Sequence, residues 1–151
     1  MRASTFGSVP LRSFSDIEKI DPPCKFDLIF AGSVVTHLPE QSTRALLEKF
    51  LSWLNTGGLA VLSTHGSTAA NQQLSGQVDY TLGGDRSLAL TGYYRTGYGY
   101  ADYPNTSGYG VSLTQPMWFL SLLDGLPAVE ISAIIERGWD FHHDLIAFKR
   151  R

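Results

Sequence analysis

The sequence has only one cysteine, Cys24, among its 151 residues. A single thiol cannot close an intramolecular disulfide and has no C-x-x-C partner for a metal, so we expect a reducing compartment and a cytoplasmic protein. No apolar run approaches the roughly 18 residues that a membrane-spanning helix needs, and the N-terminal stretch lacks the apolar centre of a signal peptide. We therefore expect no association with a membrane.

An excess of charge of either sign is also missing. Twelve Lys and Arg residues stand against 14 Asp and Glu residues, which gives a formal net charge of −2. This balance offers no general attraction to nucleic acid or to an anionic membrane, and the short basic end at 149–151 is typical of a solvated terminus. The length and the 43% of hydrophobic residues suit a single domain with one core.

Two familiar catalytic or nucleotide-binding motifs are absent. The closely spaced glycines at 97–99 and 108–110 neither follow an apolar strand nor open a helix, so neither pair is expected to bind a phosphate group. No G-x-S-x-G segment occurs, so Ser33 and nearby His37 do not form the nucleophile elbow of a hydrolase.

A metal site is not expected at His142-His143-Asp144. The segment is predicted to be a strand, in which neighbouring side chains point to opposite faces, so the two histidines should not ligate one ion. No cysteine or third histidine stands at ligand spacing in the sequence.

The most informative stretch is residues 26–66, where the hydrophobic period changes twice. The run 26–31 (FDLIFA) is typical of a strand buried on both faces. An amphipathic helix is predicted over 40–54, stopped by Gly57-Gly58, and a second apolar strand follows over 59–64. Strand, crossover helix and strand predict a βαβ unit with parallel strands and a right-handed connection.

The segments on either side of residues 26–66 show a weaker hydrophobic periodicity. Residues 4–9 could form one short strand before the unit. Toward the C-terminus, a short apolar helix is predicted over 116–123. Strands over 129–135 and 141–149 should follow as an antiparallel pair around a turn at 136–139.

Residues 67–113 form the least regular stretch and hold all seven tyrosines of the chain. Low helix propensity and alternation over 87–94 predict hairpin-like segments within a long loop. Such a loop is often functional, and a lid whose Tyr98, Tyr100 and Tyr103 contact a substrate is one interpretation. A surface excursion or an oligomer contact is the other, and both remain open.

Together, FDLI, a polar strand end, THLPE, an amphipathic helix and LNTGGLAVLST resemble a segment of the class I S-adenosylmethionine (SAM)-dependent methyltransferases. In that family they would be the fourth strand, the following helix and the fifth strand. The resemblance continues to the C-terminus, where 129–149 resembles the last two strands. It implies an α/β, Rossmann-like class I methyltransferase sheet, mixed, with a C-terminal antiparallel strand pair.

The family also opens with a strand, a glycine-rich turn and a second strand that ends in a ribose-binding acid, and these have no counterpart before Phe26. The chain therefore resembles the C-terminal part of the domain, with the N-terminal strands missing. We expect one incomplete methyltransferase-like domain over 1–151, with 67–113 as a Tyr/Gly-rich insertion or lid.

The resemblance also implies a site, with SAM as cofactor and a small molecule as methyl acceptor. Ala31, Gly32 and Ser33 would line the methionine side of SAM. His37 resembles a histidine that many members place there, and it could act as a base or simply hold the start of the helix. His65, after the fifth strand, is a weaker candidate for substrate contact.

Two functions remain open at this point. The chain could be the C-terminal part of a SAM-dependent methyltransferase acting on a small molecule. It could instead be a non-catalytic, methyltransferase-like binding or scaffold subunit that has lost the cofactor loop. If the chain is such a C-terminal part, strand 26–31 lacks its expected neighbour on one side, and an unpaired apolar edge predicts self-association.

Overall fold

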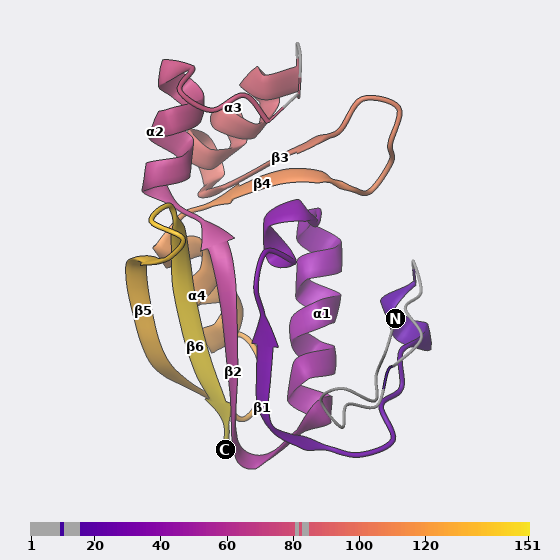
Figure 1. The fold of residues 1–151 in the computed structure, drawn as a ribbon. Coiled ribbons are helices and arrows are strands. Elements are labelled where there is room, and N and C mark those ends of the chain that lie inside the picture. Colours follow the sequence, from indigo (N-terminus) through magenta and orange to yellow (C-terminus); the bar gives the residue numbers. More distant parts are fainter. Residues whose placement is uncertain (1–9, 11–15, 81, 83–84) are drawn as a thin grey trace.

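The computed structural model describes residues 10, 16–80, 82 and 85–151 (Figure 1). The strand considered over 4–9 lies outside these residues. The described elements follow the order η2 (Ile17–Lys19), β1 (Phe26–Ala31), η3 (Val35–His37), α1 (Glu40–Trp53), β2 (Leu54–His65), α2 (Ser67–Ser75), α3 (Arg86–Thr96), β3 (Tyr98–Asp102), β4 (Gly110–Thr114), α4 (Pro116–Asp124), β5 (Val129–Trp139) and β6 (His143–Arg150).

The predicted βαβ unit is confirmed. β1 pairs in parallel with β2, with Leu28 opposite Leu59 and Ala31 opposite Leu62. α1 connects the two strands and buries an apolar face that includes Leu47 and Phe50. β2 begins earlier than predicted, because a register shift between β1 and β2 lets the Gly57-Gly58 segment join the strand rather than end the helix as a separate turn.

The main sheet has the order β1-β2-β6-β5, and β6 runs antiparallel to both of its neighbours. The predicted antiparallel pair at the C-terminus is therefore confirmed, but the turn predicted over 136–139 is wrong. β5 continues to Trp139, whose indole packs edge-on against Phe30 with ring centroids 5.9 Å apart. The chain reverses afterwards, through Asp140 and Phe141, both with positive φ.

One face of the sheet is covered by α1 and α4, which lie on the same side (Figure 1). The register aligns Ala31, Leu62, Ile146 and Ile134 in one row across that face. These residues pack against the two helices, and the largest buried side chains of this core are Leu47, Leu54, Leu62, Phe119, Leu123, Ile146 and Phe148.

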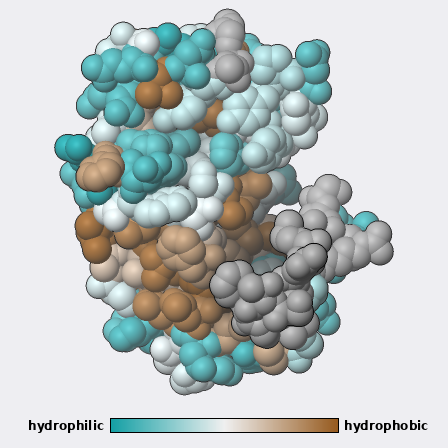
Figure 2. Space-filling model, viewed as in Figure 1, coloured by the Kyte–Doolittle hydropathy of each residue, from teal (hydrophilic) through white to brown (hydrophobic). Residues whose placement is uncertain are grey.

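The opposite face of the sheet is apolar, and the described residues leave it largely uncovered. Strand 26–31 was expected to be buried on both faces, yet Leu28 is 59% exposed and Phe30 57% exposed. Ile135 lies on the same face of β5 and is 52% exposed. Figure 2 shows apolar surface gathered over the strand half of the molecule, below a more polar half. The sequence therefore carries a two-sided strand pattern, of which the described chain buries only one side.

The stretch 67–113 is more regular than predicted. Residues 87–94 belong to helix α3 rather than to a hairpin, because Ala89 and Tyr93 are buried against the neighbouring elements and Gly97 ends the helix at φ 84°. The hairpin is formed by β3 and β4, a separate two-stranded antiparallel sheet. With α2 and α3 it has a small core of its own, built from Ala69, Ala70, Leu82, Ala89, Tyr93, Ala101, Val111 and Leu113.

This second cluster lies beyond the carboxyl ends of β1 and β2 (Figure 1). It is therefore placed over the sheet edge at which ligands of open α/β folds bind. None of the described helices is long and apolar enough to cross a membrane.

Among the described residues, little covers this sheet face and no strand pairs with the outer edge of β1, and both features predict self-association. We expect the wild-type chain to associate in a concentration-dependent way, and the double substitution Leu28→Lys/Phe30→Lys to shift it toward monomer, since lysines at an edge oppose pairing. Sedimentation velocity measures this. The matched control Gln41→Lys/Ser52→Lys adds the same charge on the exposed face of α1. Equal effects of both pairs would assign the change to net charge and contradict the prediction.

Candidate functional site

The end of β1 is held by a hydrogen bond to the neighbouring strand. The backbone N–H of Ser33 donates to Ser63 Oγ at 2.8 Å, and Ser33 has a positive φ of 54°. Its hydroxyl lies 3.4 Å from that of Thr36. Ser33 is half-buried, whereas Ala31 is part of the buried core. Of these strand-end residues, Ser33 is thus the one presented at the mouth of the sheet.

Gly32 lies close to two aromatic side chains. A Cβ atom at this position would lie 2.7 Å from the Trp139 indole and 2.9 Å from the Phe30 ring. Those contacts are closer than real Cβ atoms approach other atoms, so a larger residue at this position would require the Trp139 or Phe30 side chain to move. The Trp139 indole therefore lies in the space beside the Gly32 backbone.

His37 is the last residue of η3 and faces the β3–β4 hairpin. Its Nδ1 lies 2.9 Å from the carbonyl oxygen of Gly110. A carbonyl oxygen can only accept, so Nδ1 carries the proton and, in the neutral ring, the lone pair is on Nε2. Tyr109 stacks on the imidazole with centroids 5.0 Å apart, and the Tyr103 hydroxyl lies 3.3 Å from Nδ1. His37 is thus oriented with Nε2 as the atom able to accept a proton.

Hydrogen bonds connect the β3–β4 hairpin to η3, to Leu38 directly after it and to the end of β2. Tyr98 donates its hydroxyl to the carbonyl oxygen of Leu38 at 2.5 Å, and Ser112 Oγ donates to that of Val35 at 2.8 Å. On the other side, His65 Nδ1 lies 3.2 Å from the Ser112 carbonyl oxygen. These hydrogen bonds hold the hairpin against η3 in this structure.

The three tyrosines predicted to contact substrate occupy different environments. Tyr98 is buried and stacks on Trp118 at 4.5 Å between centroids, and its burial raises the pKa of the phenol to about 12. Tyr100 donates to the carboxylate of Asp102 at 2.5 Å, within the hairpin itself. Tyr103 alone among the three lies beside His37. The structure thus brings together His37 and Tyr103, and it uses Tyr98 to support the fold.

His65 ends β2 and is nearly fully buried, at 3% exposure. Its ring stacks on that of His143, with centroids 4.9 Å apart, and contacts the Tyr80 ring in a tilted arrangement at 5.1 Å. Burial, reinforced by the positive charge that His143 can carry, lowers the pKa of His65 to about 3. This imidazole therefore stays uncharged at neutral pH.

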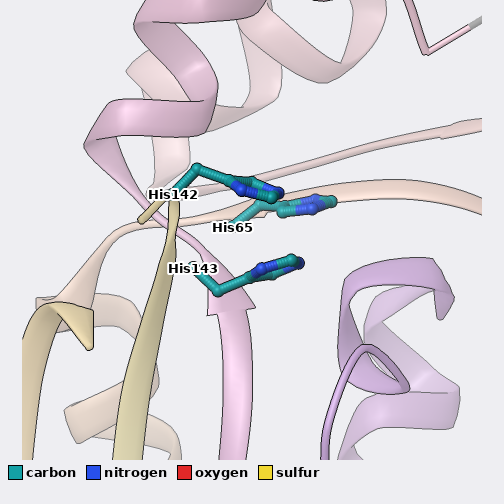
Figure 3. A group of neighbouring side chains, drawn as sticks. All are labelled: His65, His142 and His143. Atoms are coloured by element: carbon teal, nitrogen blue, oxygen red, sulfur yellow. The ribbon is translucent and has the colours of Figure 1, made fainter. Parts of the chain in front are cut away.

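The structure corrects the argument made for His142 and His143. β6 begins at His143, so His142 belongs to the preceding turn and the alternation of a strand does not apply to the pair. Their rings lie 4.0 Å apart between centroids, and both rings stack near His65 (Figure 3). A third histidine is thus present, brought in by the pairing of His65 with His143 in the β2–β6 register.

The chain matches no protein-family model and no curated protein sequence. It is similar in structure to a SAM-dependent methyltransferase from Clostridium acetobutylicum, with a TM-score of 0.58 and 10% identity over 98% of this chain and 68% of that one. It is also similar to an O-methyltransferase family 2 protein from Planctomyces limnophilus in complex with apigenin, with a TM-score of 0.52, 17% identity and 87% and 32% coverage. A third structure, magnesium protoporphyrin IX methyltransferase from Synechocystis with bound S-adenosylhomocysteine (SAH), gives a TM-score of 0.52, 14% identity and 90% and 49% coverage.

The fold is that of the class I methyltransferases. The mixed sheet with an antiparallel pair at its C-terminal side agrees with the fold class that the sequence predicted. The chain spans 32% and 49% of the Planctomyces and Synechocystis structures. Activity, cofactor and partners of the whole protein are therefore matters of proposal.

Three residues of this methyltransferase-fold site were missed from the sequence. Ser63 was detectable, because it is the first polar residue after the apolar run of β2 and parallel pairing places it beside the end of β1. Tyr109 and Trp139 were not detectable, because their positions depend on where the hairpin and the β5–β6 turn reverse the chain.

Proposed function

We propose that this chain supplies the acceptor-side half of a SAM-dependent methyltransferase that acts on a small molecule. The observation that carries the proposal is that Ser33 and His37 lie at the carboxyl end of a parallel strand pair. The β3–β4 hairpin lies next to them and places a tyrosine beside His37. Ligands of open α/β sheets bind at that edge. Support comes from solved structures of the same fold whose names describe methyltransferases, one with bound SAH and one with apigenin.

The residues present fit one side of the cofactor. SAM supplies a methyl group on a sulfonium, and its transfer depends on alignment and on exclusion of water. Ser33, with a half-buried hydroxyl and a fixed backbone, would contact the methionine part. Gly32 would contribute less than the sequence suggested, since Trp139 covers its backbone.

The acceptor would lie between Ser33 and the hairpin. There Nε2 of His37 would take the proton that an acceptor hydroxyl or amine loses as its oxygen or nitrogen bonds to the methyl carbon. The Gly110 carbonyl oxygen holds the imidazole in the required tautomer. Tyr103 and Tyr109, both in ring contact with His37, would shield that face from water.

The nucleoside part of SAM finds no matching residues in this sequence, which has neither the glycine-rich turn nor the ribose-binding acid before Phe26. We propose that a separate segment carries both features, covers the apolar face of Leu28 and Phe30, and pairs with the edge of β1 that has no partner among the described residues. Such a segment would bury the side of the strand pattern that the described chain leaves exposed.

The proposal is tested by following backbone amides with NMR while SAH is added to residues 1–151. We expect weak but localised shifts at Ser33, Val34 and His37, with half-saturation in the range of about 1–10 mM, equivalent to about 3–4 kcal/mol of binding free energy. Adenosine is the matched control, because it lacks the methionine part and should leave these amides unmoved. Shifts produced equally by both ligands, or by neither, would refute the assignment of this strand end to the methionine side.

A further inference from the structure

Three of the four histidines of the chain meet at the junction of the two cores. His65 comes from the end of β2, His143 from the start of β6 and His142 from the turn before it, and Figure 3 shows the three rings side by side. One ring nitrogen from each lies within 4.8 Å of one from each of the others. His65 and His143 are buried, and His142 is half-buried at the surface turn.

The hydrogen bonds of two of these rings fix their tautomers. His65 Nδ1 lies 3.2 Å from the Ser112 carbonyl oxygen, and His142 Nδ1 lies 2.7 Å from that of Asp140. Both partners can only accept, so both Nδ1 atoms carry protons, and each neutral ring keeps its lone pair on Nε2. A backbone carbonyl behind the distal nitrogen is the arrangement that orients histidines bound to metals.

The third ring has an unused nitrogen. His143 Nδ1 is buried and has no hydrogen-bond partner among the residues that the structure describes. Buried polar atoms nearly always have a partner, so a buried imidazole nitrogen that lacks one calls for an explanation. A bound cation beside it would provide that partner, because a neutral imidazole offers a lone pair to a metal.

We propose that His65, His142 and His143 bind one divalent transition-metal ion, zinc by preference. Ligand nitrogens at about 2.0–2.1 Å from a tetrahedral zinc lie about 3.3 Å from each other, so separations within 4.8 Å need to contract by about 1.5 Å at most. His142 can shorten its own distances to the other two rings, since it lies in the turn and not in the β2–β6 ladder that pairs His65 with His143. The Asp140 carboxylate, 3.8 Å from His142 Nδ1, places negative charge behind this ligand.

The chemistry of the donors selects the class of metal. Three imidazoles suit zinc, copper, nickel or cobalt, whereas magnesium and calcium prefer oxygen ligands. Three protein ligands leave the fourth tetrahedral position for water or for a substrate atom. This proposal does not rest on methyl transfer, so it stands or fails independently of the proposed function.

The test uses untagged residues 1–151, stripped with a chelator and titrated with zinc chloride by calorimetry. We expect one zinc ion per chain, and for cobalt(II) the intense visible bands of a tetrahedral site. His142→Ala should weaken zinc binding by about 100-fold or more, because it removes a ligand from the first coordination sphere rather than an outer partner worth about 10–100-fold. Its position in a surface turn leaves both cores intact, which circular dichroism checks.

Two further variants make the result decisive. His37→Ala is the matched control, since His37 is the one histidine outside the cluster, and it should bind zinc as the wild type does. His142→Cys should restore most of the affinity, because a thiolate is also a zinc ligand. Zinc binding that is absent from the wild type, indifferent to His142→Ala or lost equally in His37→Ala would overturn the proposal.

Discussion

Residues 1–151 are expected to bind SAM about a thousandfold more weakly than a complete methyltransferase domain, on the rule of about 1.4 kcal/mol per factor of ten. A glycine-rich turn and a ribose-binding acid together supply several charge-assisted or backbone hydrogen bonds, each worth about 1.5–3 kcal/mol. Losing three such hydrogen bonds, each at the lower value of about 1.5 kcal/mol, is enough to weaken the affinity for SAM by about a thousandfold. Neither feature is present before Phe26.

Isothermal titration calorimetry measures this difference, with the Clostridium acetobutylicum methyltransferase titrated in the same buffer as the reference. The reference should saturate in a range where the present chain gives no heat above dilution. Micromolar affinity of residues 1–151 for SAM would contradict the prediction and would require a nucleoside site elsewhere in this chain.

The glycine pairs of the hairpin region do not offer such a site. A Cβ atom on Gly99 would lie 1.7 Å from the Ala89 carbonyl oxygen, and one on Gly110 would lie 1.9 Å from that of Ala101. Both glycines thus let backbone segments of the protein approach each other. The sequence interpretation, which excluded these pairs as phosphate loops because no strand and helix flank them, agrees with this packing.

The elements that the sequence predicted well are those whose pattern is local. The apolar run of β1, the change of period after Pro39 and the apolar run over 59–63 each lie within a few residues, and together they predict β1, α1 and β2, although Gly57-Gly58 lies within β2 and is not the stop that was predicted. α3 was missed for the opposite reason. It contains Gly92 and two adjacent tyrosines, which lower helix propensity, and it is stabilised by packing against β3 and β4 that no local pattern shows.

The same distinction separates the parts of the site. Ser33 and His37 follow one strand and could be placed from the resemblance of that segment alone. The histidine cluster could not, because His65 and His143 are neighbours only through the antiparallel register of β2 and β6. His142 joins them because packing of Trp139 against Phe30 extends β5 and moves the turn later in the chain.

The close approach of α3 to β3 predicts a large loss of stability for Gly99→Ala. The added methyl group would meet the carbonyl oxygen and carbon of Ala89 at 1.7 Å and 2.6 Å and the backbone nitrogen of Tyr93 at 2.7 Å. All three are backbone atoms, so no side chain can rotate away and the helix must separate from the strand. We expect a loss of about 3 kcal/mol or more, at the upper end for overpacking, and urea denaturation followed by circular dichroism measures it.

Gly108→Ala is the control that separates overpacking from backbone strain. Gly108 lies at the tip of the same hairpin with φ 75°, and a Cβ atom there would meet nothing within 4 Å. It should cost only the left-handed conformational penalty of about 1–2 kcal/mol. Hydrogen exchange should also show α3 opening in Gly99→Ala, because loss of its contact with β3 releases a locally cooperative unit. Equal losses in the two variants, with α3 still protected in both, would mean that α3 does not pack on β3 as the structure shows.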